Sequence, residues 1–191
     1  MKKTIVTRSA NDKLYKIAKS FWSNENTFIQ CKKFAGFNGA LEYLLHLFEG
    51  NTYNGFIVNC DEDFFLTNES LVDSIIEQMK INPFFNVFNV DLIKTKFLEF
   101  NNSKQFEYAN KVEKNANVDE PFAGFFYWLH LNFKHGNFTD IESTDGVSTV
   151  IKINDKPLGI HSWYSRHYGV DTAQTLRIDN CIEWALLNKS K

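Results

Sequence analysis

Two carboxylates follow directly on a short apolar run in the first third of the chain. Residues 55–60 form this run, and Asp61, Glu62 and Asp63 come next. In an extended segment alternate side chains share a face, so we expect Asp61 and Asp63 to point one way and Glu62 the other. Mg²⁺ and Mn²⁺ prefer carboxylate, water and phosphate oxygens as ligands. The pair therefore predicts a divalent-metal site, although acids at a strand end also serve as turn or capping residues.

A second group of candidate residues lies near the end of the chain and comprises His161, Trp163, Tyr164, Arg166 and His167. A neutral imidazole is a competent ligand for Mn²⁺, and the two aromatic neighbours of His161 could exclude water and hold its ring. Arg166 can hold phosphate oxygens through two nitrogens at once, and His167 offers another donor. We therefore expect His161 at the metal and the other four at the substrate. The alternatives are a histidine with ordinary hydrogen bonds and an arginine paired with a surface carboxylate.

Strand-like and helix-like patterns alternate along the first half of the chain. Strands are expected at 4–7, 27–30 and 55–60, and helices at 10–22, from a Gly36–Gly39 turn to 48, and from 68 to 79. This alternation is typical of α/β proteins. We predict a three-layer α/β/α fold with a mixed, mainly parallel central sheet, formed by residues 1–191 as a single domain. Ligands of open α/β sheets bind beyond the carboxyl ends of strands, which is where Asp61 lies.

The second half of the chain shows weaker periodicity. Extended structure is expected at 84–90 and 146–153, buried structure at 122–133, a turn at 155–157, and a helix at 172–188. The inward face of that helix is predicted to carry Leu176, Ile178, Ile182 and Leu186. Residues 104–120 are polar and charged, which is typical of a solvated loop or helix edge; a lid over a ligand is the alternative.

Composition narrows the classes of function. The chain has 191 residues, of which 43% are hydrophobic and 23% charged, as in ordinary globular proteins. A net charge of -2 with dispersed lysines provides no electrostatic basis for binding nucleic acid. Three widely separated cysteines argue against a disulfide framework and a zinc knuckle, so we expect a reducing compartment. No apolar segment is long enough to span a bilayer, and we predict a cytoplasmic location, free or peripheral to the inner face of the membrane.

The order of these features resembles the nucleotide-sugar glycosyltransferases of the GT-A fold. The resemblance extends over residues 4–169 and is carried chiefly by 59–63, 122–126 and 159–169. In that family an Asp-x-Asp motif binds a divalent metal that bridges the diphosphate of the sugar nucleotide. Several members place a late histidine near an aromatic residue, where it completes the metal shell or contacts the diphosphate. The resemblance therefore implies Mn²⁺ or Mg²⁺ held by Asp61, Asp63 and His161.

The same resemblance implies the substrates and partners. The donor would be a UDP- or GDP-linked sugar and the acceptor a carbohydrate or a lipid-linked molecule, in polysaccharide or glycoconjugate synthesis. At 191 residues the chain is short for such an enzyme. Part of the acceptor site would then come from another domain or another subunit, as in a homo-oligomer.

The implied reaction is displacement at the anomeric carbon of a sugar, with a nucleoside diphosphate as the leaving group. A metal ion held by Asp61 and Asp63 would neutralise the charge that develops on the departing phosphate. If the transfer inverts the stereochemistry, a carboxylate must also deprotonate the acceptor hydroxyl. Glu120 is the candidate for this base, and Asp119, Asp140 and Glu142 are equally eligible by type.

Two other interpretations remain open. Haloacid-dehalogenase-like phosphatases also end a strand in Asp-x-Asp, with the first acid as nucleophile, the second as acid and base, and Mg²⁺ as cofactor. Their motif usually lies near the N-terminus and is followed one residue later by Thr or Val, whereas two α/β units precede Asp61 and the matching residue is Phe65. The other interpretation is a non-catalytic domain that binds a sugar, a nucleotide or a protein. Such a binder has no need of a metal cluster.

Overall fold

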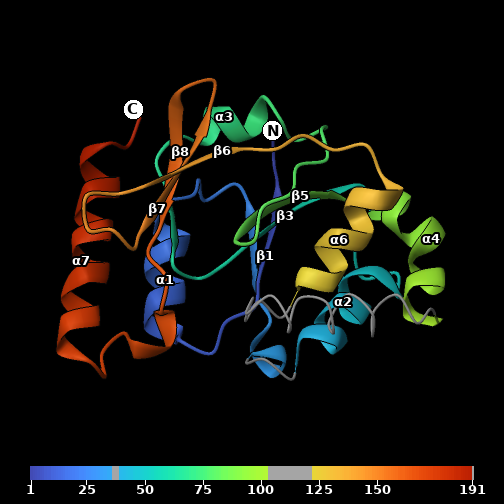
Figure 1. The fold of residues 1–191 in the computed structure, drawn as a ribbon, viewed down its shortest axis with the longest axis horizontal. Helices are drawn as coiled ribbons and strands as arrows, with labels where there is room; N and C mark the ends of the chain where they lie inside the picture. Colours follow the sequence, from blue (N-terminus) through green and yellow to red (C-terminus); the bar gives the residue numbers. More distant parts are fainter. Residues whose placement is uncertain (36–38, 103–121, 191) are drawn as a thin grey trace.

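The structure is a computed structural model that describes residues 1–35, 39–102 and 122–190 of the chain (Figure 1). The strands are β1 (Thr4–Thr7), β2 (Thr27–Gln30), β3 (Phe56–Cys60), β4 (Phe64–Leu66), β5 (Phe85–Asn89), β6 (Thr139–Glu142), β7 (Thr149–Ile153) and β8 (Lys156–His161). The α-helices are α1 (Asp12–Ser20), α2 (Ala40–Phe48), α3 (Glu69–Asp73), α4 (Val90–Asn102), α6 (Ala123–Asn132) and α7 (Thr172–Leu187). Short 3-10 helices occur at η1 (Lys32–Phe34) and η3 (Ser165–His167). The protein is therefore of the α/β class, as predicted.

The described strands form two sheets. The first is mixed and has the order β2-β1-β3-β5, in which β1 is parallel to β2 and β3, and β5 is antiparallel to β3. The second has the order β4-β8-β7-β6 and is antiparallel throughout. Because β1 and β3 run in the same direction, their carboxyl ends meet at one edge of the mixed sheet.

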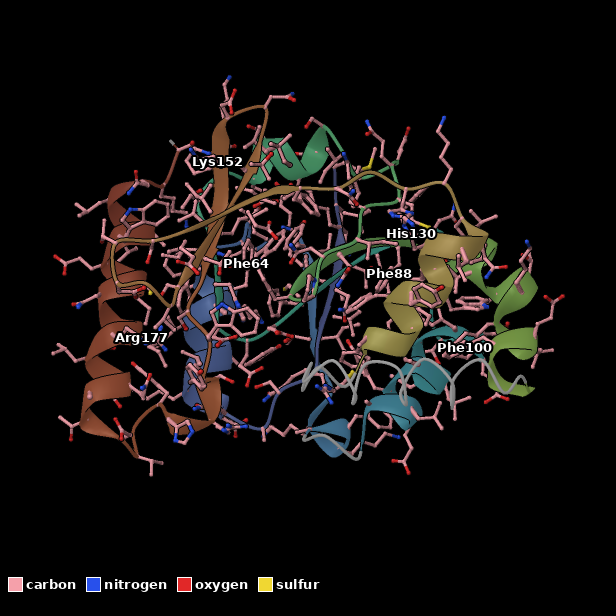
Figure 2. All side chains as sticks on the ribbon, viewed as in Figure 1. Phe64, Phe88, Phe100, His130, Lys152 and Arg177 are labelled. Atoms are coloured by element: carbon pink, nitrogen blue, oxygen red, sulfur yellow. The ribbon has the colours of Figure 1, made fainter. Side chains whose placement is uncertain are left out.

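The mixed sheet lies between two different layers. Ile5 and Val6 are neighbours in β1 and point to opposite faces. Val6 packs with buried side chains of α2, α4 and α6, whereas Ile5 packs with those of α1, α7 and the second sheet. Figure 1 shows this order of layers, and Figure 2 shows Phe64 and Phe88 on opposite sides of the mixed sheet. The predicted helix layer on the second face is thus wrong in part, because an antiparallel sheet supplies much of it.

The second sheet arises because the chain turns back after Asp63. Strand β4 follows that turn and pairs with β8, and its three residues are all buried. The ring of Phe64 packs against Phe85 of the mixed sheet at 4.8 Å between centroids. A three-residue apolar segment is too short to show a strand periodicity, so the sequence did not reveal β4.

Most predicted strands are confirmed, but several details of the helices are wrong. Asn68 caps α3 through the backbone N–H of Leu71, yet this helix ends at Asp73 instead of continuing to 79. In α7, Leu176 and Leu186 are 63% and 59% exposed, and the buried face carries Ile178, Cys181 and Ala185. With this face α7 contacts β4 and β8.

Two further expectations concern a turn and a long loop. The turn that joins β7 to β8 is at Asn154 and Asp155, which have positive φ angles of 49° and 63°, so Lys156 and Pro157 already belong to β8. The polar segment 104–120 lies outside the described residues. Within the described residues, no helix combines the length and apolar character that crossing a bilayer requires.

Candidate metal centre

A tight turn, rather than an extended strand, presents the two aspartates. Strand β3 ends at Cys60, and the Asp61 backbone N–H donates to the carbonyl of Phe84 at 3.0 Å. The Phe64 N–H then donates to the carbonyl of Asp61 at 3.2 Å, which closes the turn into β4. The predicted convergence of Asp61 and Asp63 is therefore present, but the alternation argument behind it is wrong because the chain is not extended there.

His161 reaches the aspartates because β4 and β8 pair. It is the last residue of β8 and lies opposite Phe64, the residue that follows Asp63. Its Nε2 is 3.0 Å from Oδ1 of Asp63 and 3.5 Å from Oδ2 of Asp61. Ser162 adds two bonds to Asp63, one from its N–H to the carbonyl at 3.0 Å and one from Oγ to the carboxylate at 3.5 Å.

The centre is enclosed on one side and open on the other. His161 is 2% exposed; Phe84 stacks on its ring at 4.1 Å, and Trp163 meets it edge-on at 4.5 Å and also contacts Phe84 at 5.4 Å. The Asp63 side chain is buried, whereas that of Asp61 is 40% exposed. A ligand can therefore approach from the side of Asp61.

The charges of the cluster are strongly coupled. Burial by itself lowers the pKa of His161, but Asp63 and Asp61 outweigh this and raise the pKa to about 9. Burial, together with repulsion from Asp63 and Asp61, raises the pKa of Glu62 to about 8. Without a metal ion, the centre therefore retains protons at neutral pH that a cation would displace.

The side chains present fit a divalent cation. One ligand atom each from Asp61, Asp63 and His161 lies within 4.8 Å of the others. Around an ion with bonds of about 2.1 Å, adjacent octahedral ligands lie about 3.0 Å apart and opposite ligands about 4.2 Å apart. The separations of 3.0 and 3.5 Å from the imidazole nitrogen are close to the first value. These three residues could thus hold a metal ion, as predicted.

The predicted substrate-binding residues are dispersed. Trp163 contacts the His161 ring directly, and Tyr164 follows it with 49% of its surface exposed. Arg166 is exposed and donates from Nε to Nε2 of His167 at 3.1 Å. Among the described contacts, none joins Arg166 or His167 to the aspartates.

The predicted candidates for a base also lie apart from the centre. Glu120 and Asp119 are outside the described residues. Asp140 accepts a hydrogen bond from Asn82 at 2.8 Å, and Glu142 lines a cleft of about 500 Å³ between β6, β8 and α7. In the part of the chain that the structure describes, no contact joins Asp140 or Glu142 to His161.

Two residues near the centre were missed by sequence reasoning. Arg8 follows β1 directly, and its positive charge lowers the pKa of Asp61 against the larger effect of burial. Its guanidinium also lies 4.6 Å from the centre of the Phe122 ring. Glu62 was expected to point away, but it lies close enough to Asp63 and Asp61 for their charges, together with burial, to raise its pKa. Arg8 could have been identified from the expected parallel strands, because the residues that follow β1 and β3 lie at the same edge of the sheet.

The fold and the site together define an α/β protein with a mixed sheet and an Asp–Asp–His cluster at the carboxyl edge of that sheet. Comparisons of the chain with protein-family models, curated proteins and solved structures found no match. The chemistry of the cluster is therefore the basis for a functional assignment.

Proposed function

We propose that this protein is a divalent-metal-dependent glycosyltransferase of the GT-A type. It would move a sugar from a nucleoside-diphosphate sugar to an acceptor hydroxyl. The observation that carries the proposal is the convergence of Asp61, Asp63 and His161 where β1 and β3 end. The resemblance implied that a late histidine joins the Asp-x-Asp motif. The contact between His161 and Asp63 across 98 residues of sequence supports that implication.

The surroundings of the cluster are suited to a diphosphate. When bound, a divalent ion would neutralise negative charge that develops on the departing diphosphate. Arg8, whose positive charge lowers the pKa of Asp61, would add to this neutralisation. Because Mg²⁺ prefers oxygen ligands and His161 contributes a nitrogen, the set favours Mn²⁺ over Mg²⁺.

An inverting transfer would also need a base for the acceptor hydroxyl. Glu62 now joins Glu120 as a candidate, because it lies beside the cluster and its raised pKa makes it a stronger base than an ordinary carboxylate. The nucleotide and the sugar of the donor are to be identified by the screen described next.

The test is a thermal-shift screen of UDP- and GDP-linked sugars, with and without Mn²⁺. We expect at least one donor to raise the melting temperature only when Mn²⁺ is present. Asp63→Asn should abolish this shift, because it removes a buried ligand charge. Asp155→Asn is the matched control, since it makes the same chemical change in the exposed β7–β8 turn and should leave the shift intact. A shift indifferent to Mn²⁺ and to Asp63→Asn would contradict the proposal.

Product assays separate the proposal from its two alternatives. A glycosyltransferase releases nucleoside diphosphate from the donor only when acceptor or water takes the sugar. Release of inorganic phosphate from simple phosphomonoesters with Mg²⁺ would instead support a phosphatase. Donor binding without any turnover across a panel of acceptors would support a binding domain.

A further inference from the structure

The metal-facing histidine lacks the hydrogen bond that usually orients such a residue. Metal-binding histidines generally donate their second ring nitrogen to a carboxylate, a carbonyl or water, which fixes the direction of the ring. In His161, Nε2 faces the aspartates, but Nδ1 is buried and has no hydrogen-bond partner among the described residues. Apart from the contact of Nε2 with Asp63, the orientation of the ring therefore comes from its packing.

That packing depends on the position of Trp163. Phe84 stacks on one face of the His161 ring with only 8° between the planes, and Trp163 packs beside this pair, with its ring 4.5 Å from His161 and 5.4 Å from Phe84. Trp163 is itself held at two points. Its Nε1 donates to Oγ1 of Thr149 at 3.1 Å, and its carbonyl accepts from Nη2 of Arg177 at 2.8 Å.

The backbone that carries Trp163 is in a strained conformation. Trp163 and Tyr164 both have φ angles of 60°, in the left-handed region that residues other than glycine rarely adopt. Such conformations persist only where their surroundings impose them. Here the Arg177 guanidinium donates to the carbonyls of both Ser162 and Trp163, so one side chain spans the start of the strained turn.

Arg177 is well fixed for this task. Figure 2 shows it on the side of α7 that faces the second sheet, and its side chain is only 13% exposed. Its Nη1 donates to Oγ of Ser148 at 2.9 Å and its Nε to Oε1 of Gln174 at 3.0 Å. Ser148 in turn donates to Asp145 at 2.6 Å. The planar fork of an arginine can bind several acceptors at once, which a lysine ammonium in the same place cannot reproduce.

We propose that Arg177 is the positioning residue of the metal centre. It holds the Ser162–Trp163 turn so that Trp163 keeps the His161 ring directed at Asp61 and Asp63. Among its described contacts, none is with Asp61, Asp63 or His161. This inference rests on the proposed function, because it presumes that the three residues bind a metal ion.

The test measures Mn²⁺ affinity by calorimetry and the visible spectrum of bound Co²⁺, neither of which needs turnover. Arg177→Lys keeps the charge but loses the fork, and we expect Mn²⁺ to bind about 10- to 100-fold more weakly, as for other outer-shell partners. The far-UV circular dichroism should stay unchanged. In Arg177→Ala, added guanidinium should restore part of the affinity, whereas the same concentration of NaCl should not.

A second variant removes the other hydrogen bond that holds Trp163 in place. Thr149→Val removes the acceptor for the Trp163 indole and should also weaken Mn²⁺ binding and alter the Co²⁺ spectrum. Thr139→Val is its matched control, because Thr139 is exposed at the start of β6 and should leave both unchanged. If Arg177→Lys does not fold, the result for Thr149→Val decides. Weaker Mn²⁺ binding by this variant would support the inference, and unchanged binding would refute it.

The two proposals fail in different ways. Wild-type protein that binds no Mn²⁺ would remove the metal centre and this inference with it. Wild-type protein that binds Mn²⁺, with Arg177→Lys and Thr149→Val equal to it, would overturn the role of Arg177 alone and leave the proposed function standing.

Discussion

At the scale of single residues, the types of the side chains correctly indicated a possible metal site. The spacing of the residues along the chain did not correctly predict which way each side chain points. Asp61 and Asp63 were expected to converge because alternate residues of a strand share a face, yet a tight turn brings them together. Glu62 was expected to point away, and it lies beside the same centre. The turn was not predictable because its three residues, 61–63, include neither glycine nor proline, the strongest local turn signals.

A pH dependence follows from the protonation of His161. An ion can bind Nε2 only when that nitrogen carries no proton, and the pKa of His161 is about 9 without the ion. Below this pH the deprotonated fraction rises about tenfold per pH unit. We therefore expect Mn²⁺ affinity to increase between about pH 7 and pH 9 and then to level off, with proton release on binding.

The measurement is calorimetry in buffers that differ in ionisation enthalpy. His161→Gln is expected to bind more weakly and to lose most of the slope, and any slope that remains comes from the carboxyl groups of the centre, among which Glu62 has a pKa of about 8 and Asp61 a raised pKa. Wild-type affinity that is flat over this range, with no proton release, would show that His161 does not bind the ion.

At the scale of elements, regular periodicity was predictable and lateral pairing was not. Strands β1, β2 and β3 were correctly placed from their apolar runs. Helix α4 was missed because it begins directly after β5, without a spacer or a turn signal. The contact of His161 with Asp63 depends on the pairing of β4 with β8, which no local pattern specifies. The site ligands were predictable by type, whereas their assembly needed the fold.

One glycine controls this pairing. A Cβ on Gly159 would lie 2.4 Å from Cζ of Phe64 and 2.6 Å from the carbonyl oxygen of Phe65. Because a backbone atom cannot move away easily, we expect Gly159→Ala to lower the free energy of unfolding by about 1–3 kcal/mol. It should also weaken Mn²⁺ binding, since β8 carries His161.

Chemical denaturation measures the first effect and calorimetry the second. Gly50→Ala is the matched control, because a Cβ there would meet its nearest neighbour at an ordinary 3.6 Å. The control should alter stability by less than about 1 kcal/mol. Equal stability of the two variants would mean that β4 and β8 separate easily to admit a larger residue.

At the scale of the whole molecule, the candidate metal centre joins the two sheets. The aspartates follow β3 of the mixed sheet, and the histidine ends β8 of the antiparallel one. An ion bound to both would be lost on unfolding, so its binding energy adds to the stability of the fold.

We accordingly expect Mn²⁺ to stabilise the entire chain. At a free concentration 100 times the dissociation constant, the free energy of unfolding should rise by about 2.7 kcal/mol, and it should keep rising with concentration. Denaturation monitored at several Mn²⁺ concentrations measures this. Asp63→Asn should remove the dependence, and a wild-type curve that Mn²⁺ does not shift would contradict the expectation.

The long separation between the ligands also has a consequence for biosynthesis. On the ribosome, Asp61 emerges before Asp63, and Asp63 emerges 98 residues before the centre can be completed by His161. Strand β4 has β8 as its sheet neighbour, so until then it has no strand to pair with. A nascent chain would therefore bind its ion only at a late stage of translation. Tight metal binding would then indicate that β8 has paired with β4 to form the second sheet.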